Sequence, residues 1–449
     1  MSGATEGLLP PDAGYGSLVG TVADPLMRRR MGRWYWGAFA LALLMTLVMA
    51  GTIAWLFIEG IGIFGNNTTI VWGFPIANYV WWVGIGNAGT LISSMLLLTR
   101  QPWRAAINRF AEAMTLFAVS IAGLFPILHL GRPYLSYWLA PYPNTMLLWP
   151  QWRSALVWDF AAIVTYLLFS VMFFYLGLIP DLATLRDRAQ SRAGRVIYGV
   201  LALGWRGSAR HWARHDQVYR AMAAMAVPLV VSVHSVVGLD FAAGIMPGWQ
   251  ETIFPPYFVV GALFSGFAMV VVLAALMRWG FGLQSLLTAR HFDAMAKVIL
   301  AASVVMGLSY GTEWLMSWYG GERAERSFLL NQLTGSDAGL YWAMIACNVA
   351  VPQVLWSAAA RRSLPVLIGV SLLVNVGMWL ERILIIWDTL SHGYLPSMWR
   401  PWHTTIWDWS LLAGSLGFFA LMFLVFARVL PVVSMHDMAK LLRQRDGDA

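Results

Sequence analysis

The chain has 449 residues, of which 59% are hydrophobic, 14% are aromatic and only 12% are charged, and its formal net charge is +8. An ordinary soluble domain carries roughly 25% charged residues, so this composition excludes a soluble protein and predicts a membrane protein with several spans. The basic residues are almost all arginines in the connections between apolar runs. We therefore attribute the positive charge to membrane topology and predict no nucleic-acid partner.

Cys347 is the single cysteine, and it lies within an apolar run. One cysteine excludes disulfides, cysteine-ligated zinc, iron–sulfur clusters and covalently attached c-type haem for this chain alone. We predict no metal site, so any redox centre is non-covalent or belongs to a partner. The first apolar run is too long for the core of a signal peptide, and we expect it to be retained as a span.

The apolar runs predict an all-α, polytopic membrane domain. A bilayer core about 30 Å thick needs about 20 helical residues, and runs of this length occupy residues 34–430 between an N-terminal tail (1–33) and a C-terminal tail (431–449). Ten spans are predicted, at Trp34–Ile58, Ile76–Leu98, Phe110–Leu130, Leu156–Ile179, Tyr219–Ala243, Tyr257–Arg278, Ala296–Trp318, Gly339–Ala359, Leu364–Ile386 and Thr405–Val429.

The Lys and Arg residues mark the two sides of the membrane. Most of the 30 fall in the chain ends or in every second connection, and positive residues collect on the cytoplasmic side. Both termini are therefore predicted to be cytoplasmic, which requires an even number of spans. In this orientation the arginine-rich connection 180–217 lies inside, and the connection 131–155, rich in Pro, Tyr and Trp, lies outside.

Ionisable residues inside a membrane are costly and are candidates for function. In the predicted orientation they lie mainly toward the outer face, and the inner halves of the spans carry chiefly Ser, Thr, Asn and Tyr. The outer groups are His129, Asp159, His234, Asp240, Glu313, Glu381, Arg382, Asp388, His403 and Asp408. For the last four of these, a helix-end charge close to water is the simpler explanation.

His129 and Asp159 have the chemistry that oxidation of a hydroquinone requires. An imidazole exchanges a proton near neutral pH, and a carboxylate orients it or accepts the proton next. His234 and Asp240 are six residues apart, about 9 Å along a helix axis and on different faces, so they are not expected to contact the same ligand atom. We keep Asp240 as a second proton acceptor and His234 as a weaker candidate.

Gly84, Gly86 and Gly89 spell a GxGxxG pattern that in another context would indicate dinucleotide binding. That function needs a turn between a strand and a helix. Here the pattern lies inside an apolar span, where small residues allow helices to pack closely. We therefore predict a helix contact at these glycines.

Bound haem is a further alternative. His129 and His234 are candidate axial ligands for one b-type haem, but two stacked haems need four suitably placed histidines. Four others are predicted to lie in loops or in the tail, which disfavours a two-haem cytochrome b: His211, His215, His291 and His436.

Three segments carry a resemblance to a known family. The run His129–Pro133 ends span three, Trp158–Phe160 opens span four, and Tyr175–Ala183 closes it. These segments resemble the NrfD/PsrC family of membrane subunits related to polysulfide reductase. Ten spans together with the last run make the chain most similar to the quinol-binding membrane subunit of bacterial alternative complex III.

The resemblance implies two antiparallel four-helix bundles, spans 2–5 (about 76–243) and spans 6–9 (about 257–386), flanked by spans 1 and 10. It implies a quinol site on the outer side of the first bundle, with no cofactor bound by the chain itself. His129 and Asp159 match the quinol-site positions of the family, and Asp240 matches by location. No motif of the family supports a proton path through Glu313, Glu381 and Asp388.

The sequence therefore predicts a quinol-oxidising membrane subunit of a respiratory or photosynthetic complex in the bacterial inner membrane, with proton translocation left open. His129, Asp159 and Asp240 accept protons, and Arg132 anchors the outer loop or a partner. Menaquinol is expected ahead of ubiquinol, although both need the same protein groups. The expected partners are an iron–sulfur subunit, a multihaem cytochrome c and a sister NrfD-like membrane subunit.

Three alternatives remain. The chain is a structural or proton-conducting sister subunit without a quinol site, the quinone-reducing subunit of a molybdopterin oxidoreductase, or a secondary transporter. A transporter is expected to place its polar site at the membrane midplane, between broken helices. The charges here are predicted to lie toward one face, which favours the electron-transfer functions.

Overall fold

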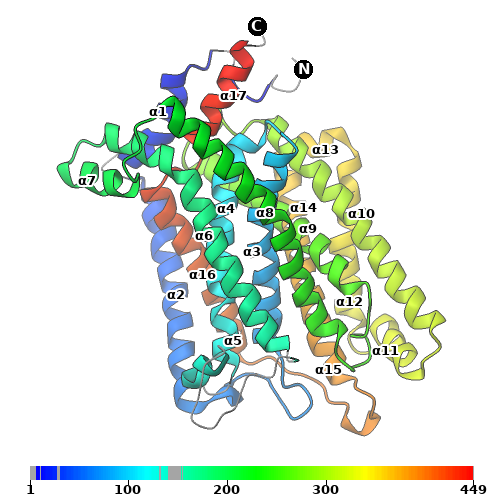
Figure 1. The fold of residues 1–449 in the computed structure, drawn as a ribbon. Helices are drawn as coiled ribbons and strands as arrows, with labels where there is room; N and C mark the ends of the chain where they lie inside the picture. Colours follow the sequence, from blue (N-terminus) through cyan, green and yellow to red (C-terminus); the bar gives the residue numbers. More distant parts are fainter. Residues whose placement is uncertain are drawn as a thin grey trace.

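The computed structural model describes residues 7–10, 12–27, 31–130, 133–139, 153 and 155–447. Within those ranges every regular element is a helix. Ten helical segments are long and apolar enough to cross a membrane, which confirms the predicted number. We call the end of the domain that carries α1 (Tyr15–Met27) and α17 (Met435–Gly447) the tail face, and the opposite end the site face (Figure 1).

The long helices run between these two faces and are joined by shorter ones. The shorter elements are η2 (Ile61–Ile63), η3 (Pro133–Leu139), α7 (Arg192–Leu201), α11 (Arg323–Thr334), α13 (Ala358–Arg362) and η7 (Pro396–Met398). The ten segments of spanning length are α2 (Arg33–Glu59), α3 (Phe74–Leu98), α4 with α5 (Arg104–Ala122 and Leu124–His129), α6 (Ala155–Arg188), α8 (Ala209–Ala242), α9 (Phe254–Gly280), α10 (Ala289–Tyr319), α12 with η4 and η5 (Ala338–Ile345, Ala346–Ala350 and Val351–Trp356), α14 with η6 and α15 (Leu364–Ile383, Leu384–Asp388 and Thr389–Ser391), and α16 (Ile406–Val429).

Several helices begin earlier than their apolar runs predicted, because polar residues at their ends cap them. Helix α8 begins at Ala209, ten residues before the predicted start, and the Ser208 hydroxyl accepts a hydrogen bond from the His211 amide. Helix α10 begins at Ala289 behind a capping box at Thr288. Satisfying the first free N–H groups in this way stabilises a helix start outside the apolar zone. Hydropathy alone therefore underestimated these lengths.

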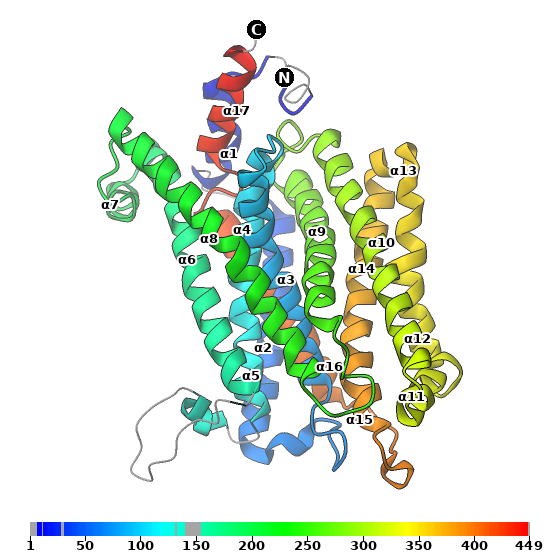
Figure 2. The same cartoon turned by 45° about the vertical axis from the view of Figure 1, so that its right-hand side comes forward.

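Helix α3 lies at the centre of the domain and is buried along nearly its whole length. It packs against α4, α8, α9 and α14. The neighbours form two rings of contacts that share α3 and α9, one through α4, α6 and α8 and the other through α10, η4 and α14. Figure 2 shows the α10 and α14 side of this arrangement. Helix α2 lies at the edge and packs against α16.

Small residues bring α4 and α9 close to α3. A Cβ atom at Gly89 would lie 1.9 Å from the Ala111 carbonyl oxygen, and one at Gly86 would lie 2.6 Å from Val119 Cγ2. A Cβ at Gly266 of α9 would lie 1.9 Å from the Ala88 Cβ. The prediction that these glycines serve helix packing is therefore confirmed at Gly86 and Gly89.

Two prolines leave backbone carbonyl groups inside the domain without their usual N–H donor, and polar side chains take the place of that donor. Pro180 has no N–H for the Leu176 carbonyl four residues earlier, and that oxygen lies 3.0 Å from His215 Nε2. Pro352 likewise leaves the Asn348 carbonyl free, and it accepts a 2.8 Å hydrogen bond from the Ser303 hydroxyl. In an environment without water, such substitutes are what allows a proline within a spanning helix.

We expect Gly89→Ala to destabilise the protein by about 1–3 kcal/mol, because the new methyl group meets backbone atoms that have no room to move. Gly369→Ala is the matched control, since a Cβ there meets nothing within 4 Å. Thermal unfolding in detergent, followed by loss of the monodisperse peak, measures both variants. Equal midpoints for the two would contradict the close α3–α4 contact.

Candidate functional site

A cavity of about 750 Å³ opens at the site face between α3, α5, α6 and α8. Its walls are mainly apolar and include Ile127, Phe160 and Leu167, among which only a few polar side chains stand. The polar residues that line it include Tyr79 of α3, Ser120 of α4, His129 of α5, Asp159 of α6 and Asp240 of α8. Few polar groups in an apolar cavity are typical of a small-molecule site.

Asp159 lies at the centre of the polar groups in this cavity. Its Oδ2 accepts a 2.6 Å hydrogen bond from the Tyr79 hydroxyl, and the Asp240 carboxyl lies beside it. Asp159 is only 7% exposed. Two neighbouring carboxylates repel each other, so a pair of this kind is suited to binding a proton between its members.

His129 is the last residue of α5, which continues α4 after Gly123. It lines the same cavity as Asp159 and Asp240. Its Nδ1 is buried and meets no hydrogen-bond partner among the described residues. Arg132, which was predicted to anchor the adjoining loop, lies outside the described residues.

Three residues that line the cavity each have one buried polar atom without a partner within the described ranges: His129 Nδ1, Asp159 Oδ1 and Asp240 Oδ1. Buried polar atoms are nearly always paired, so each such atom requires an explanation. A ligand that donates hydrogen bonds from an apolar ring would satisfy them. The arrangement suits a flat, apolar molecule that carries two hydroxyl groups.

The structure places His234 outside this cavity. Its Nδ1 lies 2.7 Å from Asn87 Nδ2 of α3, and the side chain is buried toward α9 near Phe258. His234 and Asp240 point to different sides of α8 because six residues turn a helix by about 240°. Of the two, only Asp240 is among the residues that line the cavity, and a ligand contact by either residue stays a prediction.

The three residues of the candidate proton path are not among those that line this cavity. The Tyr310 hydroxyl donates to Glu381, and Asn348 Nδ2 donates to the Tyr310 oxygen over 2.9 Å. Arg382 lies 2.9 Å from Glu381 and covers the Phe258 ring. Asp388 instead pairs with His392 at 3.0 Å. Glu313 lies on α10, one turn beyond Tyr310.

The expectation that the inner halves of the spans carry chiefly Ser, Thr, Asn and Tyr missed a buried group of charges. Arg109 and Asp181 form a 2.8 Å ion pair near the tail face, and each side chain is only 1% exposed. Arg109 also lies 3.9 Å from Glu112, and Arg104 pairs with Asp437 of α17 at 3.2 Å. Arg104 and Arg109 were assigned to a loop, but α4 begins at Arg104. These arginines are buried because carboxylates of α4, α6 and α17 neutralise them.

Glu112 connects these ion pairs to hydroxyl groups on neighbouring helices. Its Oε1 accepts hydrogen bonds from Ser93 at 2.5 Å and from Tyr219 at 2.8 Å. Sequence analysis overlooked Glu112, although an Arg three residues before a Glu in an apolar run is the spacing of a helical ion pair. Burial acts to raise the pKa of Asp437, but the Arg104 guanidinium and the cations beside it outweigh burial and lower that pKa below its usual range.

Comparison with known proteins agrees with this architecture. Residues 62–391 match the family described as polysulphide reductase, NrfD. The chain belongs to the NrfD family. It is a multi-pass membrane protein, as its ten apolar helices and its family both indicate.

Two curated relatives are similar to this NrfD-family chain. One is a putative dimethyl sulfoxide reductase membrane subunit of Halobacterium salinarum, 28% identical over 247 residues that cover 55% of this chain and 52% of the relative. The chain thus matches about half the length of that protein. The other is a selenate reductase subunit of Mesobacillus selenatarsenatis, 23% identical over 393 residues, which cover 83% of this chain and 89% of the relative.

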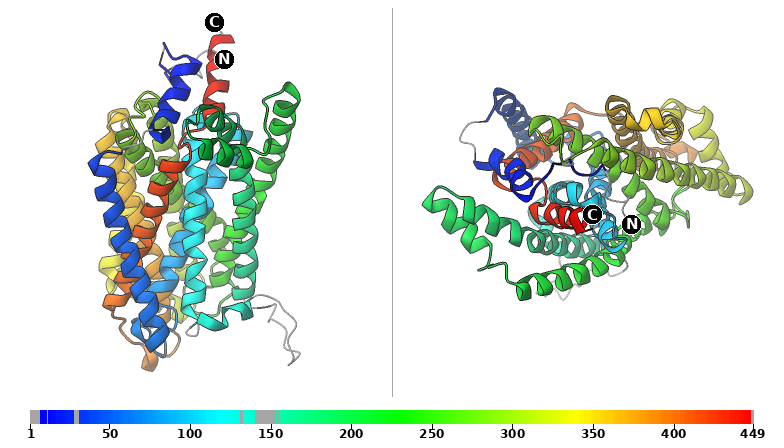
Figure 3. Two further views of the ribbon diagram at one scale, coloured as in Figure 1. Left: turned by 90° about the vertical axis from the view of Figure 1, so that its left-hand side faces the viewer. Right: turned by 90° about the horizontal axis from the view of Figure 1, so that it is seen from above.

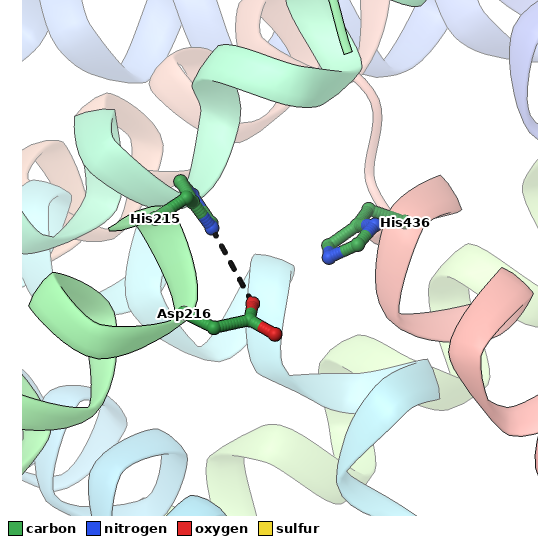
Figure 4. Close-up of side chains that lie close together, drawn as sticks. All are labelled: His215, Asp216 and His436. Atoms are coloured by element: carbon green, nitrogen blue, oxygen red, sulfur yellow. Dashed lines mark ion pairs between the residues drawn. The ribbon is translucent and has the colours of Figure 1, made fainter. Parts of the chain in front are cut away.

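Two groups of metal-ligating side chains occur in the described part of this NrfD-family protein. His215 and Asp216 of α8 face His436 of α17 at the tail face (Figure 4). Lys440 Nζ lies 2.6 Å from Asp216 Oδ1, so an ammonium group already supplies the positive charge that a metal would bring. Burial lowers the pKa of His436 to about 4, which leaves its imidazole neutral near pH 7.

The second metal-ligating group lies at the site face and contains Asp337, Asp388 and His392. Burial acts to lower the pKa of His392, but the hydrogen bond and charge of Asp388 raise it overall. Burial and the Asp388 charge raise the pKa of Asp337. The 3.0 Å contact between His392 Nδ1 and Asp388 Oδ1 accounts for this group without a metal.

Asp181→Asn should destabilise the protein by about 3–5 kcal/mol, because it leaves the Arg109 guanidinium buried without its nearest counter-charge. Asp187→Asn is the control, since the Asp187 side chain is 68% exposed and pairs with Arg186, and an exposed pair contributes less than about 1 kcal/mol. Thermal unfolding of the two variants in detergent tests this. Similar losses would show that the buried pair contributes no more than the exposed one.

A pH effect is expected at the 243–253 connection on the site face. Burial, and next the nearby charge of Glu325, raise the pKa of Glu251 from 4.5 to about 7. The folded protein therefore binds this proton more tightly than the unfolded chain, and its stability falls as the pH rises from about 4.5 to 7. Glu251→Gln should reduce that slope in thermal unfolding measured across this range. An unchanged slope would contradict this assignment.

Proposed function

We propose that this NrfD-family protein is the membrane subunit of an oxidoreductase complex and exchanges electrons with the quinone pool at the 750 Å³ cavity. The family match and the two relatives, both named as subunits of reductases, support membership of such a complex. The observation that carries the site is the set of buried acceptors on His129, Asp159 and Asp240, which have no partner within the described chain.

A quinol fits the chemistry of this cavity. Its two ring hydroxyls are hydrogen-bond donors, and the cavity offers acceptors within mainly apolar walls. Val164 lines the cavity and is also 40% exposed on the outer side of α6, next to Leu168, which is 61% exposed. These side chains face the surface that lipid would cover, so the isoprenoid tail of a quinol has an apolar way in from the bilayer.

Oxidation of the quinol releases two protons and two electrons. The Asp159–Asp240 pair is suited to binding one of the protons, and His129 has an open nitrogen for the other. Tyr79 holds Asp159 Oδ2, which leaves Oδ1 for the ligand. The two electrons leave together or in succession to iron–sulfur clusters on a partner protein, because the chain has one cysteine and so cannot ligate such a cluster alone.

Quinol oxidation is the direction that a reductase complex requires, since its catalytic partner consumes electrons. The names of the two relatives favour this assembly. Assembly with an iron–sulfur subunit, a multihaem cytochrome c and a sister NrfD-like subunit, as in alternative complex III, is the second candidate, based on the run at Tyr175–Ala183. Menaquinol remains the preferred substrate. Copurifying subunits distinguish the two assemblies, since only one contains haem c.

The proposed orientation places the tail face in the cytoplasm and the site face outside the bacterial inner membrane. Positive residues support it, since the arginine-rich connection between α6 and α8 lies on the tail face. Quinol protons would then be released outside, next to the cavity. This release would add protons to the outer side without any proton transfer through Glu313, Glu381 or Asp388.

The test compares wild type with His129→Leu and Asp159→Asn in the purified complex. A fluorescent quinol-analogue inhibitor should bind wild type at one saturable site, and its Kd should rise at least about tenfold in each variant, as expected for loss of a hydrogen bond to a buried acceptor. Turnover with quinol should fall by about 10²–10⁴, the usual contribution of a general base.

Asp293→Asn is the control, because Asp293 pairs with Lys297 and Arg361 at the tail face, far along α10 from the cavity. It should retain the binding and turnover of wild type. Intact assembly of each variant is checked by its elution profile. Absence of saturable binding in well-assembled wild type would reject the site and favour a structural sister subunit.

A further inference from the structure

Helix α7, between α6 and α8, carries an uncovered apolar surface. None of its residues is buried. The apolar face consists of Val196, Ile197, Val200, Leu201 and Leu203, whose exposed fractions run from 39% to 68%. Contiguous exposed aliphatic side chains of this kind mark a surface that another molecule or a membrane covers.

The protein holds α7 at the tail face in a fixed position. The Tyr198 hydroxyl donates to the Val429 carbonyl at the end of α16, over 3.1 Å. Tyr175 of α6 donates to the Leu201 carbonyl over 2.6 Å, and Arg186 donates to the Trp205 carbonyl over 3.1 Å. One side of α7 is therefore tied to the ends of two spanning helices, and the apolar side is left outward. Figures 1 and 3 show α7 projecting sideways from the domain at this level.

The segment that contains α7 is rich in positive charge. The segment 188–214 contains six arginines and no Asp, Glu or Lys: Arg188, Arg192, Arg195, Arg206, Arg210 and Arg214. Two tryptophans, Trp205 and Trp212, contact each other within it, with ring centroids 4.7 Å apart. Tryptophan is enriched at the boundary between lipid and water.

We propose that α7 and the arginines around it bind the surface of an anionic phospholipid membrane. The apolar face lies in the boundary between head groups and acyl chains, and the guanidinium groups contact lipid phosphates. An amphipathic helix with aliphatic residues on one face and arginines around it is suited to this position, and basic residues next to spanning helices attract anionic lipids.

The place of α7 in the fold favours lipid over a protein partner. The helix is tied to the tail-face ends of α6 and α16, which are spanning helices, so it lies at the depth where the bilayer ends. Exposed aliphatic side chains there meet lipid without any further protein. The surrounding arginines complement phosphate head groups, which carry the opposite charge. This proposal does not depend on the quinol site at the other face.

The test uses a photo-cross-linking residue in this chain within the intact complex, reconstituted in nanodiscs of equimolar phosphatidylcholine and phosphatidylglycerol. Val200→p-benzoylphenylalanine should form phospholipid adducts, with phosphatidylglycerol enriched about fivefold over phosphatidylcholine, as the attraction of basic residues predicts. Mass spectrometry of the cross-linked chain measures the ratio.

Two comparisons make the result decisive. Gln444→p-benzoylphenylalanine, on exposed α17 beyond the tail face, should form no lipid adduct. Replacing Arg192, Arg195, Arg206 and Arg210 with Gln should return the adduct ratio to the composition of the disc, while the elution profile shows that the complex is intact. Adducts with another protein of the complex, or lipid adducts at the ratio of the disc in the unmodified arginine background, would overturn the proposal.

Discussion

The close approach of α4 and α9 to α3 determines where the polar groups of the membrane domain lie. Gly89 and Gly266 leave no space between the helices, and α3 is consequently almost wholly removed from lipid. Its polar residues must then find partners on neighbouring helices, because a bilayer offers none. Tyr79, Asn87 and Ser93 do so, with a carboxylate of α6, an imidazole of α8 and a carboxylate of α4 respectively. The candidate site contains one of these contacts, that of Tyr79 with Asp159.

The parts of the structure that follow from helical periodicity and from composition could be predicted from the sequence. Apolar runs of spanning length predicted ten helices, because a bilayer imposes one length on all of them. The sequence alone predicted that Asp240 and His234 lie on different faces of their helix, since side-chain direction follows from the 100° step of an α-helix. His129, Asp159 and Asp240 were singled out because charge is costly in lipid, and they do line one cavity, whereas their role is still a proposal.

Partners contributed by other helices could not be predicted in this way. Nothing in the α3 sequence indicates that Tyr79 meets Asp159, because the contact depends on how α4 and α8 hold α6 beside α3. The same holds for the prolines. The sequence shows that Pro180 frees a carbonyl, but only the fold shows that His215 of α8 lies beside it. The assignment of Arg109 to a loop failed for a related reason: hydropathy counts its charge and cannot count the Asp181 carboxylate that neutralises it.

The two polar zones of the α3, α4, α6 and α8 ring differ in what balances their carboxylates. At the tail face, Asp181 and Glu112 have the Arg109 guanidinium within ion-pair distance, and this group of charges connects α4 with α6. At the site face, Asp159 and Asp240 have each other and a tyrosine hydroxyl, and no Arg or Lys pairs with them in the described part of the chain. A carboxyl pair without a permanent counter-ion is suited to binding and releasing a proton. This difference supports the proposal that proton exchange takes place at the site face, where the cavity lies.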